Sequence, residues 1–125
     1  MLFRDMELDF DIFDVDTAEL YEEAAKRAGE EAVKKPGETL AECIRRQCGA
    51  VFNFFDTLFG EDFHRELFGE RTNLVECLEA FREFVGLVNA QRATLDTMIA
   101  EAEAKAEGAA PNRATRRAAA RAPKA

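Results

Sequence analysis

The sequence predicts a mainly α-helical protein: a helical bundle or hairpin with a small N-terminal β-hairpin and a disordered basic C-terminal tail. Within residues 6–15, apolar and acidic side chains alternate from Met6 to Ile12, which is the period of a half-buried strand. Between residues 17 and 104, apolar side chains recur at steps of three and four, which is the period of a helix with one buried face. Residues 108–125 contain five cations and no carboxylate. We therefore expect an acidic helical domain over residues 1–107 and a disordered tail over residues 108–125.

The N-terminal segment is expected to form the hairpin. Its alternation predicts one strand over residues 6–15, and Leu2-Phe3 supplies the second arm. A lone hairpin is only marginally stable in water, so this one is expected to lie on the helices or on another subunit.

The first helix is expected from Thr17 to Lys34. Asp16 and Glu19 have the spacing of a capping box, which satisfies the first amides of a helix. Its apolar face is narrow and rich in alanine, and Pro36-Gly37 stops it.

The second helix is the most strongly patterned element. Thr39 and Glu42 have capping-box spacing at its start, and Gly60 ends it. Its apolar stripe contains Leu40, Ile44, Cys48, Val51, Phe52, Phe55, Leu58 and Phe59. A short third helix is expected over residues 62–68, because Gly60 and Gly69 bracket it.

The fourth helix is expected over roughly residues 73–104, with Thr72 or Asn73 as its cap. Its apolar stripe contains Leu74, Cys77, Leu78, Phe81, Phe84, Val85 and Val88, and continues more weakly through Leu95, Met98 and Ile99. The second and fourth helices are expected to pack through Phe52, Phe55, Phe59, Leu78, Phe81 and Val85. A helix of this length exceeds what one small core needs, so we expect self-association into a homo-oligomer.

Charge and composition limit the partners. Residues 1–107 carry a formal charge of −13 and residues 108–125 one of +5, which gives the −8 of the whole chain. An acidic body repels phosphates, so nucleic acid is not its expected partner. No apolar run is long enough to cross a bilayer, and the N-terminus lacks the pattern of a signal peptide. We expect a cytoplasmic protein whose three cysteines are free thiols.

No constellation in the sequence indicates catalysis, a metal or a cofactor. An EF-hand counted from Asp9 places Asp14 where glycine is needed and Leu20 where glutamate is needed. Cys43 and Cys48 are five residues apart on a helix, which turns them away from each other and disfavours a zinc site with His64 and Cys77. The glycines are single and form no phosphate-binding loop. We therefore expect no enzyme activity.

Two features predict contact with other macromolecules. Phe54 falls outside the main stripe of the second helix, which makes its apolar arc wider than one buried face needs and predicts an apolar protein-binding surface. The residues proposed for that surface are Phe54, Phe55, Phe59, Phe63 and Phe84. The tail presents Arg113, Arg116, Arg117 and Arg121, which could contact nucleic acid weakly, the protein's own acidic helices, or an acidic partner.

Three segments carry a resemblance to a known family. They are Glu7-Leu-Asp-Phe-Asp-Ile-Phe-Asp-Val-Asp-Thr-Ala-Glu-Leu-Tyr21, then Ile44-Arg-Arg-Gln-Cys48 with Val51-Phe-Asn-Phe-Phe-Asp-Thr-Leu-Phe-Gly60, and finally Pro111-Asn-Arg-Ala-Thr-Arg-Arg117. The chain resembles small proteins from the tail modules of long-tailed bacteriophages and prophages, similar to tail assembly chaperones. The resemblance implies binding to the long helical tape measure protein and help in tail tube assembly, in the cytoplasm of a bacterial host cell.

Two other functions remain open from the sequence. One is a structural head–tail or tail-completion component that stays in the virion. The other is a small nucleic-acid-associated regulator that uses the basic tail. A small acidic helical protein with surplus apolar surface favours the chaperone-like function, because it can lay helix against helix on an aggregation-prone client.

Overall fold

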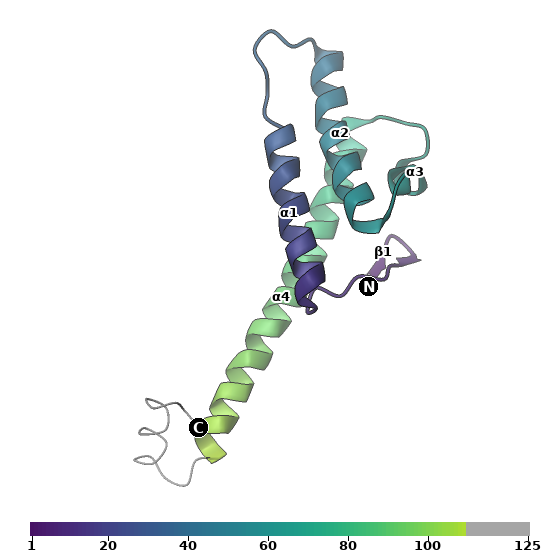
Figure 1. The fold of residues 1–125 in the computed structure, drawn as a ribbon. Coiled ribbons are helices and arrows are strands. Elements are labelled where there is room, and N and C mark those ends of the chain that lie inside the picture. Colours follow the sequence, from purple (N-terminus) through teal and green to yellow (C-terminus); the bar gives the residue numbers. More distant parts are fainter. Residues whose placement is uncertain (110–125) are drawn as a thin grey trace. The chain divides into compact units, whose positions relative to one another are not determined.

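The structure is a computed structural model that describes residues 1–109, and it confirms the predicted fold class (Figure 1). The strands and helices follow in the order β1 (Leu2–Phe3), β2 (Met6–Glu7), α1 (Val15–Glu31), α2 (Leu40–Phe59), α3 (Phe63–Phe68) and α4 (Leu74–Ala109). The chain divides into one unit over Met1–Asn89 and a second that begins at Ala90. Gly108, the first residue of the expected tail, is helical, and the tail beyond Ala109 lies outside the described residues.

The N-terminal hairpin is present, but it is shorter than predicted. Strands β1 and β2 pair antiparallel, with Phe3 opposite Met6. Arg4 and Asp5 form the turn with φ angles of 49° and 65°, as the two central residues of a tight hairpin turn require. The strand expected over residues 6–15 is therefore wrong in extent, because only Met6 and Glu7 pair with β1, and beyond Leu8, which bonds to Met1, the chain leaves the hairpin.

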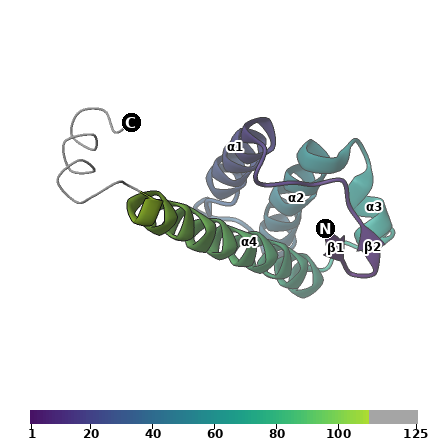
Figure 2. The same cartoon turned by 90° about the horizontal axis from the view of Figure 1, so that it is seen from below.

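The predicted alternation nevertheless describes the burial of the segment that follows β2. Leu8 and Phe10 are buried, whereas Asp9 and Asp11 are exposed. This segment lies on the helices by its side chains, because the ring of Phe10 packs 5.8 Å from that of Phe59 near the end of α2. Figure 2 shows it running from the hairpin past α2 to the start of α1.

Local signals placed the boundaries of α2 correctly. The Thr39 hydroxyl accepts a hydrogen bond from the Glu42 amide at 3.1 Å, and the Glu42 carboxylate accepts one from the Thr39 amide at 2.9 Å. Gly60 ends the helix with a φ of 115°, which a side chain would disfavour.

Helices α1 and α4 differ in how their first turns are capped. Helix α1 begins two residues earlier than expected, after Asp14, and the predicted capping box of Asp16 is not formed. At α4, Asn73 and not Thr72 provides the cap, since its side-chain oxygen accepts a hydrogen bond from the Glu76 amide at 3.0 Å.

The core of the first unit is aromatic and lies around α2. Helices α1 and α2 form an antiparallel hairpin, in which Ala24 and Ala28 of α1 are buried. Their small side chains let α1 approach α2 closely. The largest fully buried side chains are Phe3, Phe54, Phe55, Phe84, Cys48 and Cys77.

Candidate protein-binding site

The five phenylalanines proposed for a protein-binding surface belong to the core, and this corrects the sequence prediction. Phe54, Phe55 and Phe84 are at most 1% exposed, Phe63 is 7% exposed and Phe59 is half-buried. Phe54 is buried because its ring meets Tyr21 of α1 at 6.0 Å and Phe81 of α4 at 4.9 Å. Helix α2 contacts neighbours on more than one side, so its wide apolar arc is buried by packing within the unit.

Phe84 is the centre of this aromatic core. Its ring lies between 5.3 and 6.3 Å, centroid to centroid, from rings of the N-terminal segment, α1 and α2, namely Phe3, Phe10, Tyr21, Phe54, Phe55 and Phe59. Many of these pairs meet edge to face, which is a favourable arrangement of aromatic quadrupoles. A partner could reach the Phe84 ring only by unfolding the unit, because Phe84 is fully buried.

Helix α4 carries part of the exposed apolar surface, including Leu78, Leu87 and Ile99. Its fully buried face consists of Cys77, Ala80, Phe84 and Val88. Leu78, which was expected in the core, is 39% exposed, and both Phe81 and Val85 are only half-buried. The packing prediction was therefore wrong for Leu78, because α4 turns a neighbouring stripe toward the core.

Leu78, Phe81 and Val85 belong to a stripe of α4 that lies beside the buried face, and we call this stripe the seam. Its positions alternate steps of four and three without interruption and are Leu74, Leu78, Phe81, Val85, Val88, Arg92, Leu95, Ile99, Ala102 and Ala106. Val88 is 2% exposed and belongs to both stripes, whereas Ile99 is 48% exposed. The four-three spacing was visible in the sequence, and it is the pattern by which one helix packs along another.

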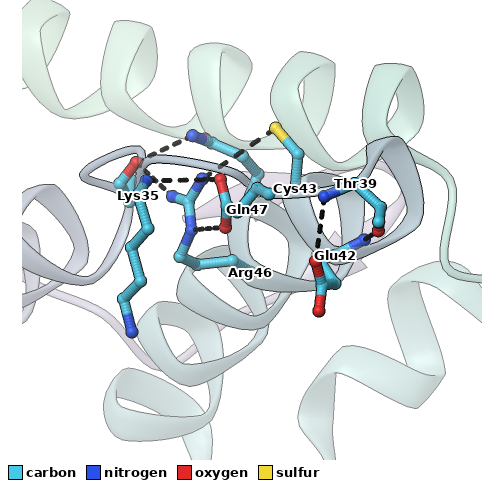
Figure 3. A network of polar contacts seen from close by, with 8 residues as sticks. Lys35, Thr39, Glu42, Cys43, Arg46 and Gln47 are labelled. Atoms are coloured by element: carbon cyan, nitrogen blue, oxygen red, sulfur yellow. Dashed lines mark hydrogen bonds and ion pairs between the residues drawn. The ribbon is translucent and has the colours of Figure 1, made fainter.

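A polar network closes the turn between α1 and α2 (Figure 3). The Arg46 guanidinium pairs with the Glu38 carboxylate and donates to the Ala32 carbonyl at 2.6 Å. The Gln47 amide donates to the same carbonyl at 2.8 Å. Hydrogen bonding from Arg46 lowers the pKa of Glu38, and the reverse interaction raises the pKa of Arg46. These charges are already paired, so the network is structural and offers no ready ligand site.

A second ion pair holds the N-terminal hairpin on α4. The Arg4 guanidinium donates two hydrogen bonds to the Glu83 carboxylate, at 2.7 and 3.1 Å. This bidentate contact lowers the pKa of Glu83 and raises that of Arg4.

The single histidine serves a structural contact. The ring Nδ1 of His64 lies 2.8 Å from one oxygen of Asp56, whose other oxygen accepts from the His64 amide at 2.8 Å. The His64 ring also stacks on Phe52 at 4.3 Å. Because Asp56 is on α2 and His64 is on α3, these contacts fix α3 to α2.

The three cysteines differ in how far they are buried. Cys48 and Cys77 are fully buried, while Cys43 is partly accessible. Burial, with a contact from Cys48, raises the pKa of the Cys77 thiol to about 12, and burial also raises the pKa of Cys48. Within residues 1–109 no group of three metal-ligating side chains converges.

Two further predictions from the sequence concern the basic tail and the membrane. The tail arginines Arg113, Arg116, Arg117 and Arg121 lie outside the described residues. No helix among the described residues combines the length and the apolar character that crossing a membrane requires.

Comparison with known proteins gives one match. A family model described as a family of unknown function (DUF6673) matches residues 4–120, which is nearly the whole chain. No curated protein and no protein of solved structure matches the chain.

Proposed function

The chain belongs to the DUF6673 family, whose function is unknown, and we propose that it is a phage tail assembly chaperone-like protein. Its client is the helical tape measure protein of a long-tailed bacteriophage or prophage. The resemblance of its sequence segments to that class supports the assignment. The observation that supports it is the seam, in which Leu78, Phe81, Val85 and Ile99 remain exposed or half-buried although the core of the first unit is filled.

The seam suits an amphipathic helix. Leu74, Leu78, Phe81 and Val85 present apolar groups at successive turns of α4, which is the spacing that a helix with the same period can match. Burying an apolar side chain of this size contributes about 1.5–3 kcal/mol, whereas an exposed ion pair contributes about 0–1 kcal/mol. The seam is therefore the main source of affinity, and charges adjust it.

Leu78 and Leu87 provide a matched pair for testing the surface. Both are exposed leucines of α4, 39% and 37% exposed respectively. They are nine residues apart, so a helix turns them about 180° from each other. Leu87 is the control for Leu78, since it has the same chemistry and exposure but lies off the seam.

The test is co-expression with the tape measure protein of the same tail gene module, followed by pull-down. The wild type and Leu87→Asp should retain the tape measure protein, and Leu78→Asp should lose it while remaining folded. Equal retention by both variants would show that the seam does not bind the tape measure protein. Absence of the protein from purified virions separates the chaperone from a structural component, and a DNA shift at physiological salt without client binding would favour the regulator.

A further inference from the structure

We infer that two copies of this protein pair through their α4 seams as an antiparallel helical dimer. The inference concerns the same seam as the proposed function. It is tested without any client, so that either can fail alone. The first observation is the exposure of the seam in the second unit, where Ile99 is 48% exposed and its chain neighbour Met98, just outside the seam, is 55% exposed. Helices gain most of their stability from packing an apolar face, so such a stripe calls for a neighbour.

The period of the seam specifies a helical neighbour. The steps of four and three run without a break from Leu74 to Ala106. Such a repeat keeps one side of a helix against a second helix with the same repeat, in a left-handed supercoil. A second copy of α4 has this repeat by definition.

The sizes of the seam residues specify an antiparallel orientation. The N-terminal half of the seam is bulky and the C-terminal end is alanine-rich. In an antiparallel pair, Leu78 meets Ala102 of the other copy, Phe81 meets Ile99 and Val85 meets Leu95. A parallel pair would instead place alanine on alanine and Arg92 on Arg92, which leaves gaps and opposes like charges.

Charge complementarity supports the same register. Arg82 and Asp96 both directly follow a seam residue, Phe81 and Leu95, so both border the seam on the same side. In the antiparallel register, Arg82 of one copy lies beside Asp96 of the other, and the two-fold axis repeats the contact. Both side chains are exposed, and neither forms an ion pair within the described part of the chain. Charges beside a seam of this kind set partner and orientation.

The residues at the centre of the pair are Val88 and Arg92, and the pairing does not require Val88 to leave the core of the first unit. Val88, which is already 2% exposed, lies opposite Arg92 of the other copy. Arg92 is the charged residue of the seam, and its long side chain can extend to solvent. The apolar contacts therefore fall on either side of the centre, at residues that remain accessible.

The test is analytical ultracentrifugation of the full chain alone, from about 1 to 500 μM, the range in which modest helical dimers dissociate. The wild type and Leu87→Asp should dimerise, and Ile99→Asp should be monomeric with unchanged helix content. Arg82→Glu and Asp96→Arg should each raise the dissociation constant about tenfold, and the double variant should restore it. A monomeric wild type, an unaffected Ile99→Asp, or a double variant as weak as the single ones would each overturn the inference.

Discussion

The ring of Phe81 on α4 stands edge-on to the ring of Phe54 on α2, with their centroids 4.9 Å apart. Phe54 is 1% exposed and Phe81 is half-buried, so this contact lies where the core ends and the seam begins. The same helix therefore supplies both the core of the first unit and the surface that we assign to partners.

The core assignment predicts unequal losses at Phe55 and Phe81. Phe55→Ala should lower the free energy of unfolding by about 3–5 kcal/mol, because Phe55 is fully buried among aromatic rings. Phe81→Ala should cost less, about 1–3 kcal/mol, since part of the ring is already in water. Urea denaturation monitored by circular dichroism measures both. An equal loss would place Phe81 in the core and remove it from the seam.

A charge at Phe54 should unfold the first unit. Phe54→Asp buries a carboxylate with no partner, which proteins tolerate poorly. The expected result is loss of cooperative unfolding, in contrast to the exposed position Leu78, where Leu78→Asp should leave the unfolding transition close to that of the wild type. A folded Phe54→Asp protein would mean that this ring lies on the surface, as the sequence pattern alone had indicated.

The cap of α2 should contribute measurably to stability. Thr39→Ala removes the hydroxyl that accepts from the Glu42 amide, and it should cost about 1 kcal/mol. Thr72→Ala is the matched control, because Asn73 provides the cap at α4 and Thr72 is exposed. Its effect should stay within about 0.5 kcal/mol. Comparable losses for the two threonines would contradict the assigned cap.

The Arg4–Glu83 pair predicts a loss of stability in acid. The pKa of Glu83 is lowered in the folded chain, so the unfolded chain binds the proton first as the pH falls. The contribution is complete above the ordinary glutamate value of 4.5 and is lost as the pH falls through the folded pKa. Glu83→Gln should flatten this dependence, and Glu79→Gln should not. Thermal unfolding between pH 7 and pH 3 measures it, and identical slopes for both variants would exclude the pair as a source.

The cysteines should react at different rates. At pH 8, Cys43 should react with an aromatic disulfide reagent within minutes, because it is partly accessible. Cys48 and Cys77 should react only on unfolding, since both are fully buried and burial favours the neutral thiol. The expected titration is about one equivalent in buffer and the full three in denaturant. Three equivalents released quickly from the folded protein would contradict the packing of α2 against α4.

Removal of residues 110–125 should weaken client binding modestly. This segment holds every cation of the basic tail, and exposed cations contribute well under about 1 kcal/mol each at physiological salt. Binding by the shortened chain should also depend less on salt. Binding measured at two salt concentrations tests this, and complete loss of binding would make the tail and not the seam the main contact.

Local signals allowed part of the fold to be predicted. The boundaries of α2 follow from Thr39, Glu42 and Gly60, which act within one turn of the chain. The length of β2 could not be predicted, because a strand depends on a partner, and here β1 begins at Leu2, which pairs with Glu7 at the end of β2. The burial of Phe54 depends on Tyr21 and Phe81, which are brought to it only by tertiary packing.

The candidate site illustrates the same limit. The two stripes of α4 share Val88 and lie on adjacent sides of the helix, so spacing alone does not show which one faces the core. The sequence pattern merged Leu78 with Cys77 into one apolar face. Packing separates them, since Cys77 is fully buried and Leu78 is 39% exposed.

The most direct test of the chaperone-like function is the soluble fraction of the tape measure protein when it is expressed with this chain. The wild type and Leu87→Asp should keep the tape measure protein soluble, because each retains an intact seam. Leu78→Asp should leave it in the pellet, although the variant itself is soluble and folded. A tape measure protein that stays insoluble with every version, or is equally soluble with Leu78→Asp, would contradict the account.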